Sequence, residues 1–169
     1  ERGRTEVSVT GRIWAIVGVF VFFSAVSSIG YLFTKAPIYV FVLLGTIWSA
    51  DIFSYVGGKC VGRRKFVSRT SPKKTWEGVF TGAIGSGTTI WVLNDLFLSL
   101  QDITLVFLFL ITFFGSIVGD LLESFLKRTA KIKHTGRLLP GHGGMLDRID
   151  SVLAAAPAFT SVIVLAELL

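Results

Sequence analysis

The chain has 169 residues, of which 51% are hydrophobic and 13% aromatic, and its mean hydropathy is +0.68. A soluble domain has about 45–50% apolar residues with glycine included, whereas the 18 glycines here come on top of the 51%. The net charge of +6 and the pI near 9.8 would suit a nucleic-acid-binding protein. The long apolar runs instead favour a membrane protein with one basic face, and a single cysteine excludes an internal disulfide framework.

Five segments are long and apolar enough for membrane helices, since about 20 residues cross the hydrocarbon core. In chain order they are residues 13–33, 36–57, 78–93 (short and glycine-rich), 103–126 and 152–169. None of them alternates strictly as a barrel strand would. We therefore predict an all-α, polytopic transmembrane helical bundle in which residues 1–169 form a single integral-membrane domain with two basic loops.

The cations are unevenly distributed between the two sides of this bundle. If the five segments alternate in direction, 16 of the 17 Lys and Arg residues fall on one side, and Lys35 falls on the other. Most of the 16 lie in the loops 58–77 and 127–148. The positive-inside rule predicts that this side is cytoplasmic.

A polar stripe ends the fourth apolar segment. Asp120, Glu123, Ser124 and Lys127 follow one another at i, i+3, i+4 and i+7, which places them on one face of a helix. Acids at membrane depth are costly and usually face a partner, the bundle interior or a water-filled cavity. The stripe suits a cation at its acidic end and a phosphate at Lys127 and Arg128, and the alternative is a structural ion pair.

A second acidic pair follows the glycine-rich turn PGHGG. Asp147 and Asp150 repeat the i, i+3 spacing, and if the turn folds them against the first pair, four carboxylates converge. Such a cluster predicts a divalent cation, and Mg²⁺ fits best because substrate phosphates can complete its octahedron. Zinc is poorly supported, because His134 and His142 have no cysteine pair beside them.

The loop 58–77 ends in SPKKTWEG, which brings Lys73, Lys74, two hydroxyl groups and Glu77 to the start of a helix. A helix N-terminus favours anions, so this segment is a candidate phosphate site. The alternative is a plain basic loop that binds anionic lipid. The glycine pair Gly115/Gly119, like the glycines at 57, 58 and 62, indicates close helix contacts and not a ligand site.

The two basic loops together resemble those of the phosphatidate cytidylyltransferases, also called CDP-diacylglycerol synthases. The signature of that family runs S-x-hydrophobic-K-R, four residues, K-D, a small residue, PxHGG and DR-hydrophobic-D. The residues that match it in spacing are Ser124, Lys127, Arg128, Lys133, Gly136, Pro140, His142, Gly143, Gly144, Asp147, Arg148 and Asp150.

Two upstream elements extend the resemblance to about residues 45–169. The family's GD-L-x-ES is present at 119–124, and its D-x-x-x-Y-x-x-G is present as Asp51, Tyr55 and Gly58. One position departs from the pattern, because His134 stands where the K-D pair of the family has Asp. Family members carry further spans before this region, so we expect the chain to be the C-terminal catalytic part of a longer protein.

The resemblance implies a reaction in which phosphatidate attacks CTP, giving CDP-diacylglycerol and pyrophosphate. It implies Mg²⁺, with a second cation such as K⁺, held by Asp120 and Asp147 and supported by Glu123 and Asp150. His142 would contact substrate or fix the turn. The residues expected on the CTP phosphates are Ser71, Lys73, Lys74 and Thr75, and those expected on the lipid phosphate or pyrophosphate are Lys127, Arg128 and Arg148.

The implied partners are CTP, phosphatidate and membrane lipids, with a homodimer left open, in a bacterial-type inner or plasma membrane with the active face cytoplasmic. Two alternatives remain at this point. One is a related CTP-dependent kinase of polyprenol-type lipids, which would release CDP instead of pyrophosphate. The other is a degenerate, non-catalytic membrane scaffold, which the His134 substitution motivates.

Overall fold

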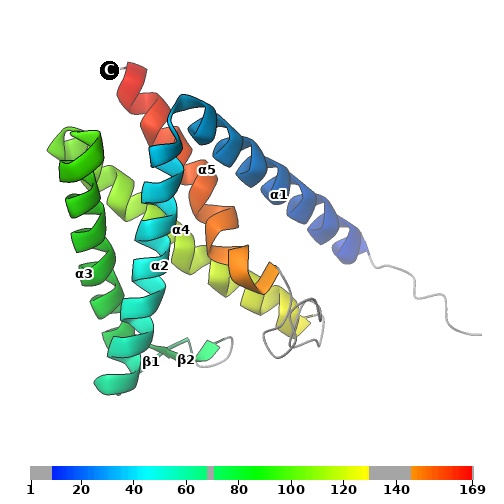
Figure 1. The fold of residues 1–169 in the computed structure, drawn as a ribbon. Helices are drawn as coiled ribbons and strands as arrows, with labels where there is room; N and C mark the ends of the chain where they lie inside the picture. The colour runs from blue at the N-terminus through cyan, green and yellow to red at the C-terminus, as the bar shows by residue number, and fades with distance from the viewer. Residues whose placement is uncertain (1–8, 68–70, 130–145, 169) are drawn as a thin grey trace, which may run out of the picture.

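The computed structural model describes residues 9–67, 71–129 and 146–168, which form a bundle of five α-helices and one β-hairpin (Figure 1). The elements are α1 (Val9–Lys35), α2 (Pro37–Cys60), β1 (Lys65–Val67), β2 (Ser71–Thr75), α3 (Trp76–Leu93), α4 (Asp102–Thr129) and α5 (Leu146–Leu168). The predicted all-α membrane bundle is confirmed. The antiparallel hairpin β1–β2 was not predicted, because its strands are too short to show an alternating pattern.

Local sequence explains where the helices turn. Ala36 is extended between α1 and α2, and Pro37 starts α2 at a position where its missing N–H costs nothing. The third helix continues beyond Leu93 as a π-helical turn, Asn94–Leu98. Asn94 closes that turn, since its side-chain oxygen accepts a hydrogen bond of 2.9 Å from the Leu100 N–H.

The core lies where α5 passes between the other helices. Phe159 of α5 is fully buried. The side chains of Leu43 and Ile47 of α2, Ile90 of α3 and Leu108 of α4 are also fully or almost fully buried. All four neighbouring side chains belong to one hydrophobic cluster with Phe159. This shared core fixes the relative heights of the helices that carry the polar residues described below.

The outer surface of the helices carries many large apolar side chains. Phe20, Trp48, Phe80 and Phe107, one from each of the first four helices, are each more than half exposed. A soluble monomer rarely exposes apolar patches of this extent, whereas a bilayer solvates them. Within the described residues, the helices α1, α2, α4 and α5 are long and apolar enough to cross a membrane.

The helix α3 is not among those four, so one of the five expected segments, residues 78–93, falls short in apolarity. It has 18 residues, and glycines, threonines and Glu77 lower its apolar character. It still runs antiparallel beside α2 in Figure 1 and packs on it more extensively than any other pair of helices does. Small residues allow this contact: a Cβ atom added at Gly82 would lie 3.0 Å from the Ala50 carbonyl oxygen, and one at Gly57 would overlap Thr81.

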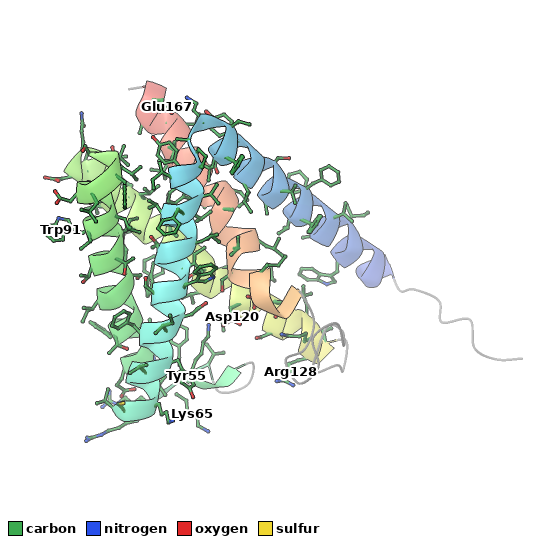
Figure 2. The ribbon with its side chains drawn as sticks, in the orientation of Figure 1. Tyr55, Lys65, Trp91, Asp120, Arg128 and Glu167 are labelled. Atoms are coloured by element: carbon green, nitrogen blue, oxygen red, sulfur yellow. The ribbon has the colours of Figure 1, made fainter. Side chains whose placement is uncertain are left out.

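The bundle has two chemically different ends. Figure 2 shows Glu167 at one end and Lys65 and Arg128 at the other. Glu167 pairs there with Lys35, the lone cation that the sequence places on that side. The hairpin and the C-terminal end of α4 therefore share the basic end.

Candidate active site

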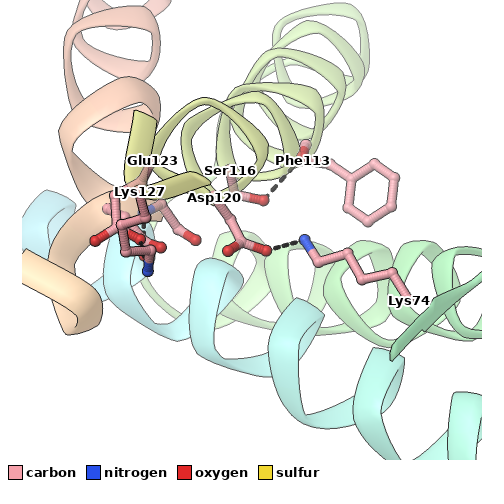
Figure 3. A network of polar contacts seen from close by, with 8 residues as sticks. Lys74, Phe113, Ser116, Asp120, Glu123 and Lys127 are labelled. Carbon is pink, nitrogen blue, oxygen red and sulfur yellow. Dashed lines mark hydrogen bonds and ion pairs between the residues drawn. The ribbon is translucent and has the colours of Figure 1, made fainter. Parts of the chain in front are cut away.

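Three carboxylates meet near the basic end, where α4 crosses α5. Asp120 and Glu123 of α4 and Asp150 of α5 each offer an oxygen atom, and these oxygens lie within 4.8 Å of one another. Glu123 is buried, and the other two residues are half-buried. Figure 3 shows Asp120 and Glu123 on the same helix turn. We call Asp120, Glu123 and Asp150 the acidic cluster.

Glycine makes this crossing close enough. A Cβ atom on Gly119 would lie 2.5 Å from the Asp150 carbonyl oxygen and 3.0 Å from the Cβ of Ala154. A Cβ atom on Gly115 would lie 3.2 Å from the Cα of Ala155. Reading this glycine pair as a close helix contact is therefore confirmed, and the contact is what brings Asp150 of α5 up to the two acids of α4.

Two lysines flank the acidic cluster. Lys74 pairs with Asp120 from the hairpin side, and Lys127 pairs with Glu123 from one turn further along α4 (Figure 3). Asp51 of α2 lies within electrostatic range of Lys74 and Asp120. Among the described side chains, four carboxylates thus face two ammonium groups, a formal excess of negative charge that a divalent cation would neutralise.

The donor set fits a hard cation such as Mg²⁺. All three ligands of the acidic cluster are carboxylates, and an octahedral ion at about 2.1 Å from its ligands holds opposite ligands roughly 4.2 Å apart. Oxygens no more than 4.8 Å apart need only a small side-chain adjustment, or one bridging water, to reach that geometry. The half-buried setting leaves room for further ligands from a substrate.

A cavity of about 350 Å³ opens on the side of α4 that faces α2 and α3. Its wall includes Lys74 and Thr75 at the end of β2 and Ser116 on α4. Thr75 is the N-cap of α3, and its hydroxyl oxygen accepts a hydrogen bond of 3.1 Å from the Gly78 N–H. Because Lys74 lines the cavity and also pairs with Asp120, it connects the cavity to the acidic cluster.

The hairpin is held to the start of α3 by Glu77. Both carboxylate oxygens of Glu77 accept the Arg64 N–H at 3.2 Å. Hydrogen bonds from the backbone N–H of Glu77 itself, and then from those of Arg63 and Arg64, hold the pKa of this carboxyl below its ordinary value. The carboxylate therefore ties the start of β1 to the start of α3, and β1 pairs with β2, the strand that carries Lys74 and Thr75.

Comparison with known proteins agrees with this geometry. The family model described as "Cytidylyltransferase family" matches residues 4–166. The chain belongs to the cytidylyltransferase family.

Several similar proteins within this family are named phosphatidate cytidylyltransferases. The chain is 44% identical to the phosphatidate cytidylyltransferase of Pseudomonas aeruginosa over 132 residues, which cover 73% of the chain and 46% of the relative. It is 37% identical to the enzyme of that name from Brucella melitensis over 150 residues, or 87% of the chain and 56% of the relative. It is 42% identical to the phosphatidate cytidylyltransferase of Haemophilus influenzae over 132 residues, which cover 73% of the chain and 43% of the relative. The chain spans about half the length of these curated relatives.

The structure of this family member brings together part of the residue set that the sequence predicts. Asp120 and Glu123 meet Asp150, Lys127 joins them, and Lys74 and Thr75 line the adjoining cavity. Arg128 lies exposed near the end of α4. The predicted meeting of Asp120 with Asp147 stays a prediction. The structure describes only the backbone of four predicted residues, which are Ser71 and Lys73 in β2 and Asp147 and Arg148 in α5. Two others, His134 and His142, lie outside the described residues.

Several residues on the cavity wall, among them Asp51, Tyr55 and Ser116, were not among the predicted site residues. Asp51 and Tyr55 of α2 line it, and both belong to the D-x-x-x-Y-x-x-G element of the family. The signal for Asp51 was present in the sequence, since an acid inside an apolar segment is costly without a function or a partner. Ser116 gave no signal, because a serine in an apolar helix commonly bonds its own backbone, as this one does to the Phe113 carbonyl at 2.8 Å.

Proposed function

We propose that this protein transfers CMP from CTP to phosphatidate, giving CDP-diacylglycerol and pyrophosphate. The observation that carries the proposal is the acidic cluster, which adjoins a lysine-lined cavity within an apolar helical bundle. The names of the relatives agree with this activity. We further propose that the basic end faces the cytoplasm and that the chain is the catalytic part of a longer membrane protein.

In this proposal the nucleotide occupies the cavity and the lipid phosphate approaches the acidic cluster. Asp120, Glu123 and Asp150, with Asp147 as the further ligand that the family pattern implies, would hold Mg²⁺ and a second cation such as K⁺. When bound, these ions would neutralise the phosphates of both substrates and so favour their approach.

The protein's own side chains position the two reactants. Lys74 stands between the cavity and Asp120, so its ammonium group can accompany the nucleotide phosphates, and Thr75 offers a hydroxyl beside it. Lys127 and Arg128 on α4, with Arg148 on α5, would hold the lipid phosphate or the departing pyrophosphate. Reactants fixed in line gain much of their rate from orientation alone.

The transfer itself needs no general base. An oxygen of the phosphatidate phosphate, already anionic, forms a bond to the α-phosphorus of CTP. The bond from the α-phosphorus to the bridging oxygen of the β-phosphate breaks, and pyrophosphate leaves with that electron pair. Lys74 would stabilise the charge spread over the phosphoryl oxygens, and cations held by the acidic cluster would supply further positive charge there.

The position of the label distinguishes this reaction from its alternatives. Membranes that contain the protein are incubated with phosphatidate, Mg²⁺ and CTP that is radiolabelled at either the α- or the γ-phosphate. We expect the α-label in the lipid extract and the γ-label in aqueous pyrophosphate. The γ-label in lipid would identify a kinase instead, and no label in lipid from either CTP would favour the scaffold.

Two variants of α4 form a matched pair for this assay. Asp120→Asn removes a ligand from the acidic cluster, and we expect transfer to fall by about 100-fold or more. Asp102→Asn changes the same residue type in the first turn of the same helix, outside the cluster. This control should keep wild-type transfer, and equal losses in both variants would remove Asp120 from the proposed site.

A further inference from the structure

The cavity beside Lys74 has two chemically different ends. Both α2 and α4 run toward the basic end of the bundle (Figure 1), so Lys59 lies at the part of the cavity nearer to that surface. Asp51, eight residues earlier on α2, lies about 12 Å further in. The apolar side chains of Phe113 and Ile117, which precede Asp120 on α4, also line the cavity. We call the part of the cavity around Asp51 and Phe113 the inner end.

An acid on the wall of this cavity needs an explanation. Among the described residues, the charged side chains that line it are Asp51, Lys59 and Lys74. A carboxylate beside a triphosphate is unfavourable, because like charges repel. Lys74 lies within electrostatic range of Asp51, but its ammonium group contacts Asp120, and Asp51 is not a member of the acidic cluster. Asp51 therefore suits a part of the nucleotide that has hydrogen-bond donors and no negative charge, which is the base or the ribose.

Ser116 supplies a second hydrogen-bond acceptor on this wall. Its hydroxyl donates to the Phe113 carbonyl oxygen at 2.8 Å (Figure 3), so its proton is committed and its oxygen remains an acceptor. The inner end thus combines the acceptors of Asp51 and Ser116 with the apolar surface of Phe113 and Ile117. Such a site fits a flat base with a donor on its edge better than it fits a ribose, which is not flat and is polar on several sides.

Cytosine carries such a donor at the position where it differs from uracil. Its exocyclic N4 amine donates hydrogen bonds, whereas uracil has an oxygen atom, O4, at that place, and carboxylates are suitable acceptors for the amine. We propose that Asp51 accepts a hydrogen bond from the N4 amine of cytosine and thereby selects CTP over UTP. The inference rests on the proposed function and adds a specificity-determining residue to it.

This assignment orients the whole nucleotide. With the base at the inner end, the α-phosphate lies near Lys74 and Asp120, and the β- and γ-phosphates point toward Lys59 and the N-terminal end of α3. The phosphates then meet cations and helix N–H groups, while the base meets apolar side chains and acceptors. Uracil in the same place would bring its O4 oxygen against the Asp51 carboxylate, and the two acceptors would repel each other.

Nucleotide selectivity is the first measurement. The values of kcat/KM for CTP, UTP and dCTP are determined with phosphatidate and Mg²⁺ for the wild type and Asp51→Asn. Asparagine keeps the size of the side chain and one acceptor oxygen, and it adds an amide donor that the O4 oxygen of uracil can accept. We expect the preference for CTP over UTP to fall by about 100-fold in Asp51→Asn, with the ratio of CTP to dCTP unchanged.

Asp102→Asn, which changes the same residue type outside the cavity, is the matched control and should leave both ratios unchanged. An equal loss for all three nucleotides in Asp51→Asn is the result expected of a metal ligand or a structural residue, and it would overturn the inference. A change in the ratio of CTP to dCTP alone would assign Asp51 to the ribose and would overturn it too.

Binding without turnover is the second measurement, and it separates this inference from the proposed function. The α,β-methylene analogues of CTP and UTP have no cleavable bond at the α-phosphate. Their dissociation constants are measured by calorimetry on the protein in detergent with Mg²⁺ and without phosphatidate. We expect the wild type to bind the cytidine analogue at least about 10-fold more tightly than the uridine analogue, and Asp51→Asn to bind the two within about threefold of each other.

The two measurements have distinct outcomes. Selective binding that Asp51→Asn removes, without CMP transfer by the wild type, would keep the inference and reject the proposed reaction. CMP transfer with the same preference for CTP in both proteins would keep the reaction and reject the inference. Failure of the wild type to bind either analogue would reject both.

A substrate analogue tests the inference even if Asp51→Asn does not fold. The triphosphate of the pyrimidin-2-one ribonucleoside has a hydrogen atom in place of the N4 amine and is otherwise like CTP. We expect the wild type to use it with a kcat/KM at least about 10-fold below that for CTP, because the hydrogen bond to Asp51 is lost. Equal use of the two nucleotides would overturn the inference.

Discussion

The two ends of the bundle use the same ion-pair chemistry with different results. At one end, Lys35 and Glu167 form a one-to-one pair at 2.5 Å, and both side chains are more than one-third exposed. At the other end, Lys74 pairs with Asp120 and Lys127 with Glu123, and all four side chains are less than one-third exposed. Among the described side chains, a further carboxylate, that of Asp150, joins the pairs at this second end.

The difference between the ends separates a structural pair from a chemical site. An exposed, balanced pair stabilises a protein by about 0–1 kcal/mol and leaves no charge to neutralise. A half-buried cluster with more carboxylates than ammonium groups is unfavourable unless another cation joins it. Among the described side chains, the excess of carboxylates at the basic end therefore favours a cation-binding site, whereas the balanced pair at the other end links α1 to α5.

The largest effect that tests this comparison is the loss of one lysine from each end. We expect Lys74→Gln to lower kcat/KM for CMP transfer by about 100-fold, because it removes the charge between the cavity and Asp120. Lys35→Gln should keep transfer within about twofold and change stability little, because water screens an exposed ion pair. Transfer is measured from labelled CTP, and stability by thermal unfolding in detergent.

Lys74→Arg serves as the control for charge at this position. It keeps the cation, so it should recover part of the lost activity if Lys74 acts through its charge. If Lys35→Gln and Lys74→Gln lowered transfer equally, the distinction between the two ends would be lost.

A smaller effect is expected from the glycine that brings α4 and α5 together. Gly119→Ala places a methyl group 2.5 Å from the Asp150 carbonyl oxygen, so α5 must shift. We expect a loss of about 1–3 kcal/mol in the free energy of unfolding, together with weaker Mg²⁺ dependence of transfer. Gly30→Ala, which meets nothing within 4 Å, should be neutral or slightly stabilising. Equal stability of the two variants would show that the helix crossing tolerates a side chain.

The smallest effect concerns the hairpin that presents Lys74. Because backbone hydrogen bonds lower the pKa of Glu77 in the folded protein, the carboxylate stabilises the fold at pH values above its ordinary pKa of 4.5. This contribution is lost as the pH falls through the lower folded-state pKa. The melting temperature of Glu77→Gln should lie below that of the wild type by a constant amount from pH 7 to about pH 5. The gap should then close as the pH falls further, and a gap that does not change with pH would exclude this role for Glu77.

Much of the fold was predictable because the bilayer constrains it. Long apolar segments can satisfy their backbone groups only as helices, so the approximate positions of four spans and the sidedness of the cations followed from composition. The hairpin, and the lower apolarity of α3 compared with the other long helices, could not be predicted from composition. Three- and five-residue strands carry no periodic signal, and α3 owes its place to glycine-mediated packing on α2.

Within the candidate site, the sequence by itself determined which chemistry is present: carboxylates at helical spacing on α4, lysines in two loops and an acid inside an apolar segment. Helical periodicity also placed Asp120, Glu123 and Lys127 on one face, because neighbours on a helix are set by local geometry.

Only the tertiary structure placed Asp150 of α5 against them. The contact of Gly119 with the Asp150 backbone sets the height of one helix against the other, and that height depends on packing between residues about thirty positions apart. The tertiary structure also brings Lys74 of the hairpin to Asp120. A linear pattern does not encode such distances, because they arise from the shapes of surfaces that meet only after the chain has folded.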